Sequence, residues 1–193
     1  LALILFITLS ILAFNFYPVS AIQVILLAVL NDGAILSIAY DNTRISEEPE
    51  KWNMYILLGV ATASGIYGVA ESLGILYLAH NVLQIDDAST RTAIYLVLSI
   101  SGHLTIFITR TEGRFWSIRP SKILVSAVVC TQLLATIISV YGLSLMAPIG
   151  WVLALIIWAY CLVLFPSQDQ VKLLAYQLLD WHRPGFLGEL IKR

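Results

Sequence analysis

The sequence predicts an all-α fold, namely a polytopic membrane bundle of six transmembrane helices. Hydrophobic residues make up 59% of the 193 residues and charged residues only 12%, about half the charge of a soluble domain. Long apolar runs alternate with short polar connections, and a helix needs about 20 residues to cross the hydrocarbon core. The net charge of −1 gives no general attraction to nucleic acid. We therefore expect the lipid bilayer, and no nucleic acid, as a partner.

The predicted spans are, in chain order, about 1–14, 19–40, 54–80, 92–110, 122–142 and 149–165. Fourteen helical residues reach only about 21 Å, which is less than the hydrocarbon core of about 30 Å. From this short first span we expect the chain to be the C-terminal part of a larger protein. The run 54–80 is longer than a span needs, so it is expected to tilt or to begin at the interface.

Prolines mark the expected edges of several spans, where they suit helix starts and stops. They are Pro18, Pro120, Pro148 and Pro166. The last of them divides the transmembrane bundle, 1–165, from a tail, 166–193. In the tail, Val171, Leu174, Leu178 and Trp181 share one helical face, with Lys172 and Asp180 off that face. This pattern predicts a helix lying on the cytoplasmic membrane surface; a frayed, solvated terminus is the alternative.

The basic residues predict the orientation of the chain. One group lies in the second and fourth connections and in the tail: Arg44, Lys51, Arg110, Arg114, Arg119, Lys122, Lys172, Arg183, Lys192 and Arg193. The opposite side holds only Arg91. Since basic residues favour the cytoplasmic side, we expect both chain ends in the cytoplasm.

Motifs for soluble chemistry are absent from the sequence, which has no Gly-rich phosphate loop, no H-E-x-x-H and no C-x-x-C. Cys130 and Cys161 both lie in apolar runs. We expect them to be packed or lipid-facing thiols and not a disulfide or a metal pair. The sequence thus predicts no metal site and no bound cofactor in this chain.

Ionisable residues inside membrane spans are costly and therefore mark functional sites. Asp32 lies near the middle of the second span, next to Asn31, and could take up a proton on one side and release it on the other. Gly33 weakens the helix, so the helix could open there and expose backbone carbonyls to a cavity. The alternative is a neutral aspartate that bonds to a neighbouring helix.

Two further ionisable residues are candidates for proton binding or transport. Glu71 lies beside a stripe of small residues that predicts close helix packing and a side chain facing the bundle. The stripe consists of Ala61, Gly65, Gly68 and Ser72. His103 shares a helical face with Ser99 and could shuttle protons. A neutral interhelical hydrogen bond for Glu71 and a packing role for His103 are the alternatives.

The stretch "LLAVLNDGAILSIAYDN", residues 26–42, resembles the sixth transmembrane helix of P-type ATPases, specifically the plasma-membrane proton pumps. Three further stretches match in the same order. "IFITRTEGRFWSIRPS" resembles the end of the eighth helix and the following loop, "QLLATIISVYG" the ninth helix, and "PIGWVLALIIWAYCLVLFP" the tenth. The resemblance identifies the six spans as helices five to ten of a proton-exporting pump.

The resemblance implies that Asp32 is the proton acceptor and donor, with Asn31 beside it. Calcium pumps of the superfamily carry an asparagine ligand where this chain has Ala28, and calcium takes about six to eight oxygens, so a proton fits better. The plant pumps also carry an arginine in the fifth helix, whereas residues 1–43 hold no Arg or Lys. Glu71 and His103 stand where neutral polar residues are expected, which allows a modified proton path. The short tail favours an archaeal or bacterial pump.

The resemblance also implies parts that this chain does not contain. The phosphorylated aspartate of D-K-T-G-T and the nucleotide domain would precede residue 1, so the fragment alone is expected to be inactive. The full-length pump would use ATP and Mg²⁺, and its N-terminal helices and cytoplasmic domains would be partners of this chain in the plasma membrane. A stand-alone proton channel or carrier, and a non-catalytic membrane scaffold, are the alternative functions.

Overall fold

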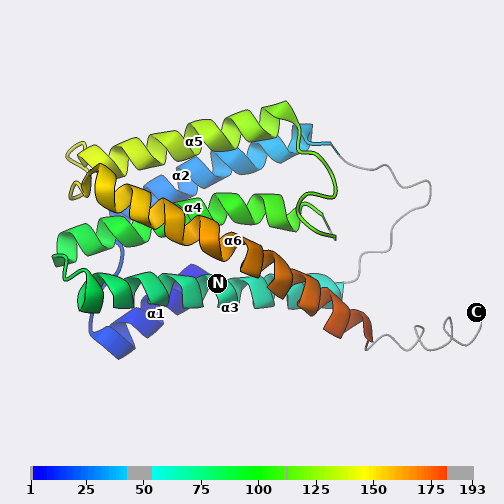
Figure 1. Ribbon diagram of the computed structural model, residues 1–193, viewed down its shortest axis with the longest axis horizontal. Coiled ribbons are helices and arrows are strands. Elements are labelled where there is room, and N and C mark those ends of the chain that lie inside the picture. Colours follow the sequence, from blue (N-terminus) through cyan, green and yellow to red (C-terminus); the bar gives the residue numbers. More distant parts are fainter. Residues whose placement is uncertain (1, 43–53, 112, 182–193) are drawn as a thin grey trace, which may run out of the picture.

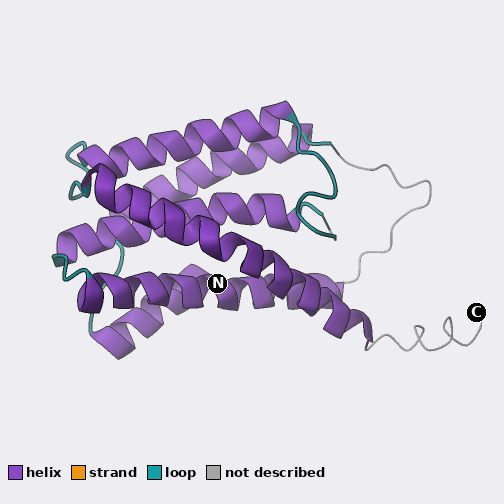
Figure 2. Cartoon of the chain, viewed as in Figure 1, coloured by secondary structure: helices purple, strands orange, loops and turns teal. Residues whose placement is uncertain are grey.

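The computed structural model describes residues 2–42, 54–111 and 113–181, and all regular structure in this part of the chain is helical (Figure 2). The helices are α1 (Ala2–Phe14), α2 (Ala21–Leu36), α3 (Met54–Tyr77), α4 (Asp87–Thr109), α5 (Lys122–Tyr141) and α6 (Gly150–Trp181) (Figure 1). A 3₁₀ turn, η1 (Ser37–Tyr40), continues α2, and a π turn, η2 (Leu78–Val82), continues α3. The segments α2–η1, α3–η2, α4, α5 and α6 are long and apolar enough to cross a membrane, and α1 is a shorter apolar helix. The predicted fold class is confirmed.

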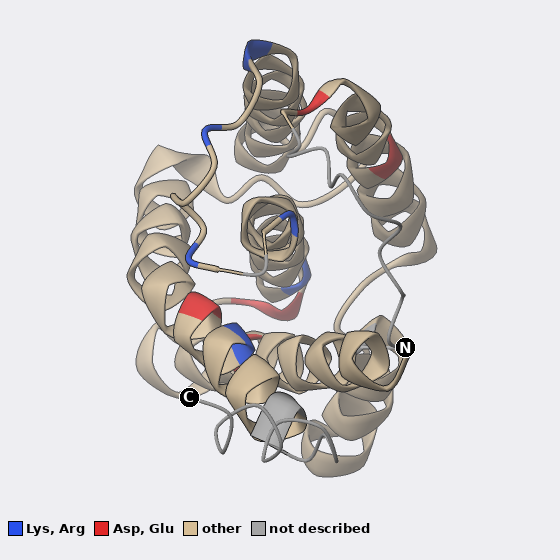
Figure 3. Ribbon diagram, turned by 90° about the vertical axis from the view of Figure 1, so that its right-hand side faces the viewer, with Lys and Arg blue, Asp and Glu red and all other residues tan. Residues whose placement is uncertain are grey.

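The helix α4 forms the centre of the bundle. It contacts α2, α3, α5 and α6, which surround it in the view of Figure 3. Its side chains Ile94, Tyr95 and Leu96 are completely buried. The main apolar core lies around this helix and includes Phe6 of α1 and Ile157 of α6. Among the described spans, α4 has the largest buried share, 61% of the residues in its apolar segment.

Capping residues explain where several helices begin. Ser20 and Gln23 form a capping box at the start of α2, and Ser121 accepts a hydrogen bond from Leu124 N at the start of α5. Asp86 caps α4 by accepting from Ser89 N at 3.1 Å. The expected start of this span at residue 92 is therefore five residues too late, because a polar N-cap and first turn precede its apolar part.

The expected end of the last helix at Pro166 is wrong. The helix α6 runs through Pro166 to Trp181, although an interior proline costs a helix about 3 kcal/mol. Contacts with other helices hold both sides of the proline: Tyr67 donates to the carbonyl of Leu164 at 3.0 Å, and Gln168 donates to Thr105 at 2.8 Å. Residues 182–193 of the predicted tail lie outside the described residues.

Other expectations about the spans have mixed outcomes. Cys130 is an exposed and Cys161 a buried free thiol, as predicted.

The small-residue stripe of α3 was expected to allow close packing, but it faces a cavity: a Cβ added at Gly68 would meet nothing within 4 Å. Of the basic residues used for the orientation, Arg44, Lys51 and those after residue 181 lie outside the described residues.

Candidate transport site

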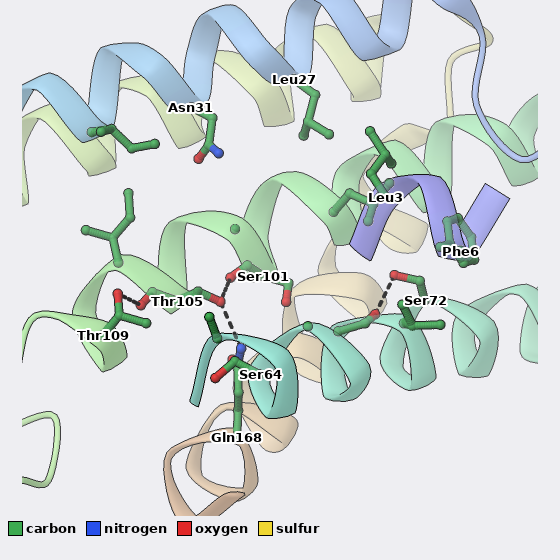
Figure 4. A pocket seen from close by; sticks show the side chains of 18 of the residues that line it. Leu3, Phe6, Leu27, Asn31, Ser64, Ser72, Ser101, Thr105, Thr109 and Gln168 are labelled. Carbon is green, nitrogen blue, oxygen red and sulfur yellow. Dashed lines mark hydrogen bonds between the residues drawn. The ribbon is translucent and has the colours of Figure 1, made fainter. Parts of the chain in front are cut away.

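A cavity of about 590 Å³ lies between α2, α3 and α4 (Figure 4). Leu3 and Phe6 of α1 and Gln168 of α6 also line it. The polar side chains in its wall are Asn31, Ser64, Ser72, Ser101, Thr105, Thr109 and Gln168. These groups are the polar part of a lining that is otherwise apolar.

Asn31 and Asp32 lie on different sides of α2, since neighbouring residues on a helix are about 100° apart. Asn31 points into the cavity, and its Oδ1 is buried without a hydrogen-bond partner among the described residues. A Cβ added at Gly102, across the cavity, would lie 3.5 Å from this oxygen. Asp32 is exposed and lies outside the set of residues that line the cavity. The structure therefore does not bring the two predicted site residues to one surface.

The helix is not opened at Gly33. The helix α2 continues without interruption to Leu36, so this conformation does not contain the opening that the sequence allows at Gly33. A Cβ added at Gly33 would lie 3.7 Å from a methyl group of Thr131, which places Gly33 on the side of α2 that faces α5. A distance of 3.7 Å is an ordinary van der Waals contact, so the packing of α2 against α5 does not itself require a glycine here.

Glu71 faces the bundle, as predicted, and is 6% exposed. Ser101 of α4 donates a hydrogen bond of 2.6 Å to its Oε2. The hydroxyl of Tyr160 in α6 donates to the backbone carbonyl of Glu71 at 2.8 Å. Because Ser101 also lines the cavity, one hydroxyl connects the carboxyl group of Glu71 to the cavity wall.

His103 links α4 to α5 and is 2% exposed. Its Nδ1 lies 2.7 Å from the carbonyl of Ser99, and its Nε2 lies 2.9 Å from the hydroxyl of Thr131. A carbonyl can only accept, so Nδ1 carries the hydrogen of that bond. Both ring nitrogens are satisfied within the helix pair, which is the geometry of a packing residue.

A row of hydroxyl groups on α4 was not predicted from the sequence. Ser101, Thr105 and Thr109 repeat every four residues and therefore share one face of the helix, which lines the cavity. Thr105 donates to the carbonyl of Ser101 at 2.7 Å, and Thr109 donates to that of Thr105 at 2.9 Å. The four-residue spacing of Ser and Thr in an otherwise apolar run is the signal that could have revealed this face.

Two buried ion pairs at one end of the bundle were also missed. Asp41 Oδ2 lies 2.9 Å from Arg110 Nε, and Asp169 Oδ1 lies 3.0 Å from Lys172 Nζ. All four side chains are at most 5% exposed. Figure 3 looks onto this end of the bundle, where charged residues of α4, α6 and the loop before α5 come together. Burial of a charge is costly unless it is paired, so these contacts order the ends of the helices.

Within the described residues, no group of three or more His, Cys, Asp or Glu side chains could hold a metal ion. The oxygens nearest to one another around the cavity come from serine, threonine and amide groups. No carboxyl group of the described residues lines the cavity itself; Glu71 reaches its wall only through Ser101.

No protein-family model matches the chain. The chain is 39% identical, over 92% of its length, to a protein of Methanocaldococcus jannaschii described as a cation-transporting ATPase, of which it covers 22%. It is 30% identical, over 83% of its length, to a probable plasma membrane ATPase of Dictyostelium discoideum and covers 18% of it. It is 28% identical, over 86% of its length, to a probable proton ATPase, 1B, of Leishmania donovani and covers 20% of it. The chain spans about a fifth of the length of these relatives.

Proposed function

Because this chain belongs to the P-type ATPases, we propose that it forms the C-terminal half of the transmembrane domain of an ATP-driven proton-efflux pump. In this proposal Asp32 takes up and releases the transported proton, and Asn31 is its polar neighbour. ATP and Mg²⁺ act on domains of the pump outside this chain, so the chain alone is inactive. The pump lies in the plasma membrane, with both ends of this chain in the cytoplasm.

The observation that supports this proposal is the environment of Asp32. It lies in the middle of an apolar helix, it is exposed on the outside of the bundle, and no described residue hydrogen-bonds to its carboxyl group. A charged carboxylate facing lipid at this depth costs about 2.5–3.5 kcal/mol by insertion measurements. This cost is avoided if the remaining helices of the pump cover this side of α2. Asp32 then lies inside the complete membrane domain, as a transport residue must.

Glu71 has a second, subordinate role in the proposal. Its hydrogen bond with Ser101 places a titratable group directly behind the cavity wall. A proton could pass between this carboxyl group and water in the cavity through the serine hydroxyl. His103 has no such place in the proposed route, because both of its ring nitrogens are engaged between α4 and α5.

The proposal is tested by the variant Asp32→Asn in the intact pump, reconstituted into sealed vesicles. Asparagine keeps the size of the side chain and removes the titratable group, so we expect ATP-driven proton transport to be lost while the protein remains inserted. Asp87→Asn is the matched control, because Asp87 is an exposed aspartate in the first turn of α4. Proton transport by Asp32→Asn at the control's rate would exclude Asp32 as the proton carrier.

A further inference from the structure

The helix α2 packs one face into the bundle and leaves the side chain of Asp32 exposed on another. At its start, Gln23 is 2% exposed and accepts a hydrogen bond of 2.8 Å from Ser20 N. In the middle, Asn31 Oδ1 has no partner among the described residues, and Asp32 is exposed. Leu30 and Ala34, on either side of this segment, are 8% and 0% exposed, and Ala34 belongs to an apolar cluster with Ile106 of α4 and Leu124 of α5. The backbone of α2 is thus packed against its neighbours, whereas the amide oxygen of Asn31 and the exposed carboxyl group of Asp32 have no hydrogen-bond partner among the described residues.

The carboxyl group of Asp41, the residue that follows η1 at the end of the α2–η1 segment, contacts the ends of two other helices. Its Oδ2 lies 2.9 Å from Nε of Arg110, the residue that ends α4. Its Oδ1 accepts a hydrogen bond of 2.8 Å from the backbone of Ser121, the residue that caps α5. Arg110 in turn donates through Nη2 to the carbonyl of Ile118 at 3.0 Å. One carboxyl group thus fixes the end of α2 to the end of α4 and the start of α5.

We infer that Asp41 and Arg110 are a positioning pair for transport, an inference that rests on the proposed function. The pair holds one end of α2 in place while the segment of Asn31, Asp32 and Gly33 changes its contacts during the cycle. Asp41 follows Asp32 by nine residues, about 14 Å along a helix. The pair therefore does not touch the proton; it acts through the helix that carries Asp32. Without this pair, the conformational change driven by ATP hydrolysis displaces the end of α2 and is not transmitted to Asp32.

The ion pair of Asp169 and Lys172 provides a matched control. It is equally buried, and it lies at the same end of the bundle. It connects α6 to the end of α4 and to the following loop, since Lys172 Nζ also donates to the carbonyls of Ile108 and Gly113, and none of these bonds reaches α2. A general loss of stability follows from disruption of either pair, but only disruption of the first releases α2.

The experiment compares the intact pump with its variants Asp41→Asn and Asp169→Asn in two measurements. The first is hydrogen–deuterium exchange of the peptide that covers residues 26–36, which reports opening of α2 whatever ion the protein carries. The second is the number of protons transported per ATP hydrolysed in sealed vesicles. We expect Asp41→Asn to raise the exchange rate several-fold and to lower the proton-to-ATP ratio at least twofold, with neither change in Asp169→Asn.

Unchanged exchange of this peptide in Asp41→Asn would overturn the inference, and so would faster exchange with an unchanged proton-to-ATP ratio, which is the result of a purely structural pair. If the parent pump hydrolyses ATP without moving protons, the proposed function fails, and the exchange measurement still decides whether Asp41 holds α2. If Asp41→Asn does not insert, Arg110→Lys replaces it. Lysine keeps the positive charge but lacks the second nitrogen that reaches Ile118, so we expect smaller changes in the same directions.

Discussion

Replacement of Lys172 by methionine should strongly destabilise the bundle. Lys172 is completely buried, and its Nζ lies 2.9 Å, 3.1 Å and 2.6 Å from the carbonyl oxygens of Ile108, Thr111 and Gly113. It lies 3.0 Å from Asp169, which is 4% exposed. Methionine has a similar length and apolar stem, so the variant removes little more than the ammonium group. It leaves a buried carboxylate without its counter-ion, which costs about 3–5 kcal/mol of the free energy of unfolding.

The assay is thermal unfolding of the detergent-solubilised protein, followed by tryptophan fluorescence. For a chain of this size each kcal/mol shifts the midpoint by about 2–4 °C, so Lys172→Met should lower it by about 6–20 °C. Lys122→Met is the control, because Lys122 is exposed at the start of α5. The double variant Lys172→Met with Asp169→Asn should recover part of the loss, since it removes the unpaired charge. A midpoint for Lys172→Met within about 2 °C of the parent's, less than 1 kcal/mol by the same conversion, would refute this reasoning.

Three further predictions concern the spans. His103→Gln should lower the free energy of unfolding by about 1–3 kcal/mol and leave the pH profile of proton transport in place; a shifted midpoint would show that His103 belongs to the route. Glu71→Gln, which can keep the contact with Ser101, should shift that profile, and an unshifted profile would remove Glu71 from the route. A cysteine placed at Arg193 should resist an impermeant thiol reagent in intact cells, whereas one at Asp87 should react, because the two lie on opposite predicted sides of the membrane; labelling at 193 would reverse the topology.

The number and order of the helices could be predicted from the sequence, because the spans differ so strongly from their connections in polarity. Their ends were harder to predict. The expected start of α4 was late because hydropathy marks the apolar part of a helix and not its polar first turn, which Asp86 caps. The expected end of α6 was early because a proline weakens a helix locally, whereas contacts made by Tyr67 and Gln168 stabilise it from other helices. Such contacts depend on residues distant in the sequence.

In the candidate site, too, some features could be predicted from the sequence and others could not. Asp32, Glu71 and His103 could be identified as candidates from the sequence alone, because each is an ionisable residue inside an apolar run. Which way each side chain points is not visible, and the structure separates them: Glu71 and His103 are buried among helices, and Asp32 is exposed on the outside. The buried pair of Asp41 and Arg110 was missed because its two members are far apart in the sequence and each resembles an ordinary charge in a connection.

The second half of α6 shows why charge alone misleads in a membrane protein. The sequence pattern correctly separates an apolar face with Leu174 and Leu178 from a polar face with Lys172. In a soluble protein the apolar face would be buried, but here Leu174 and Leu178 are 55% and 65% exposed and Lys172 is completely buried. The ammonium group of Lys172 is buried because the protein supplies its partners, namely the carboxylate of Asp169 and the carbonyls of Ile108, Thr111 and Gly113. Lys172 therefore stabilises the α4–α5 loop first of all. Its use as one of the basic residues that predict the orientation of the chain is secondary.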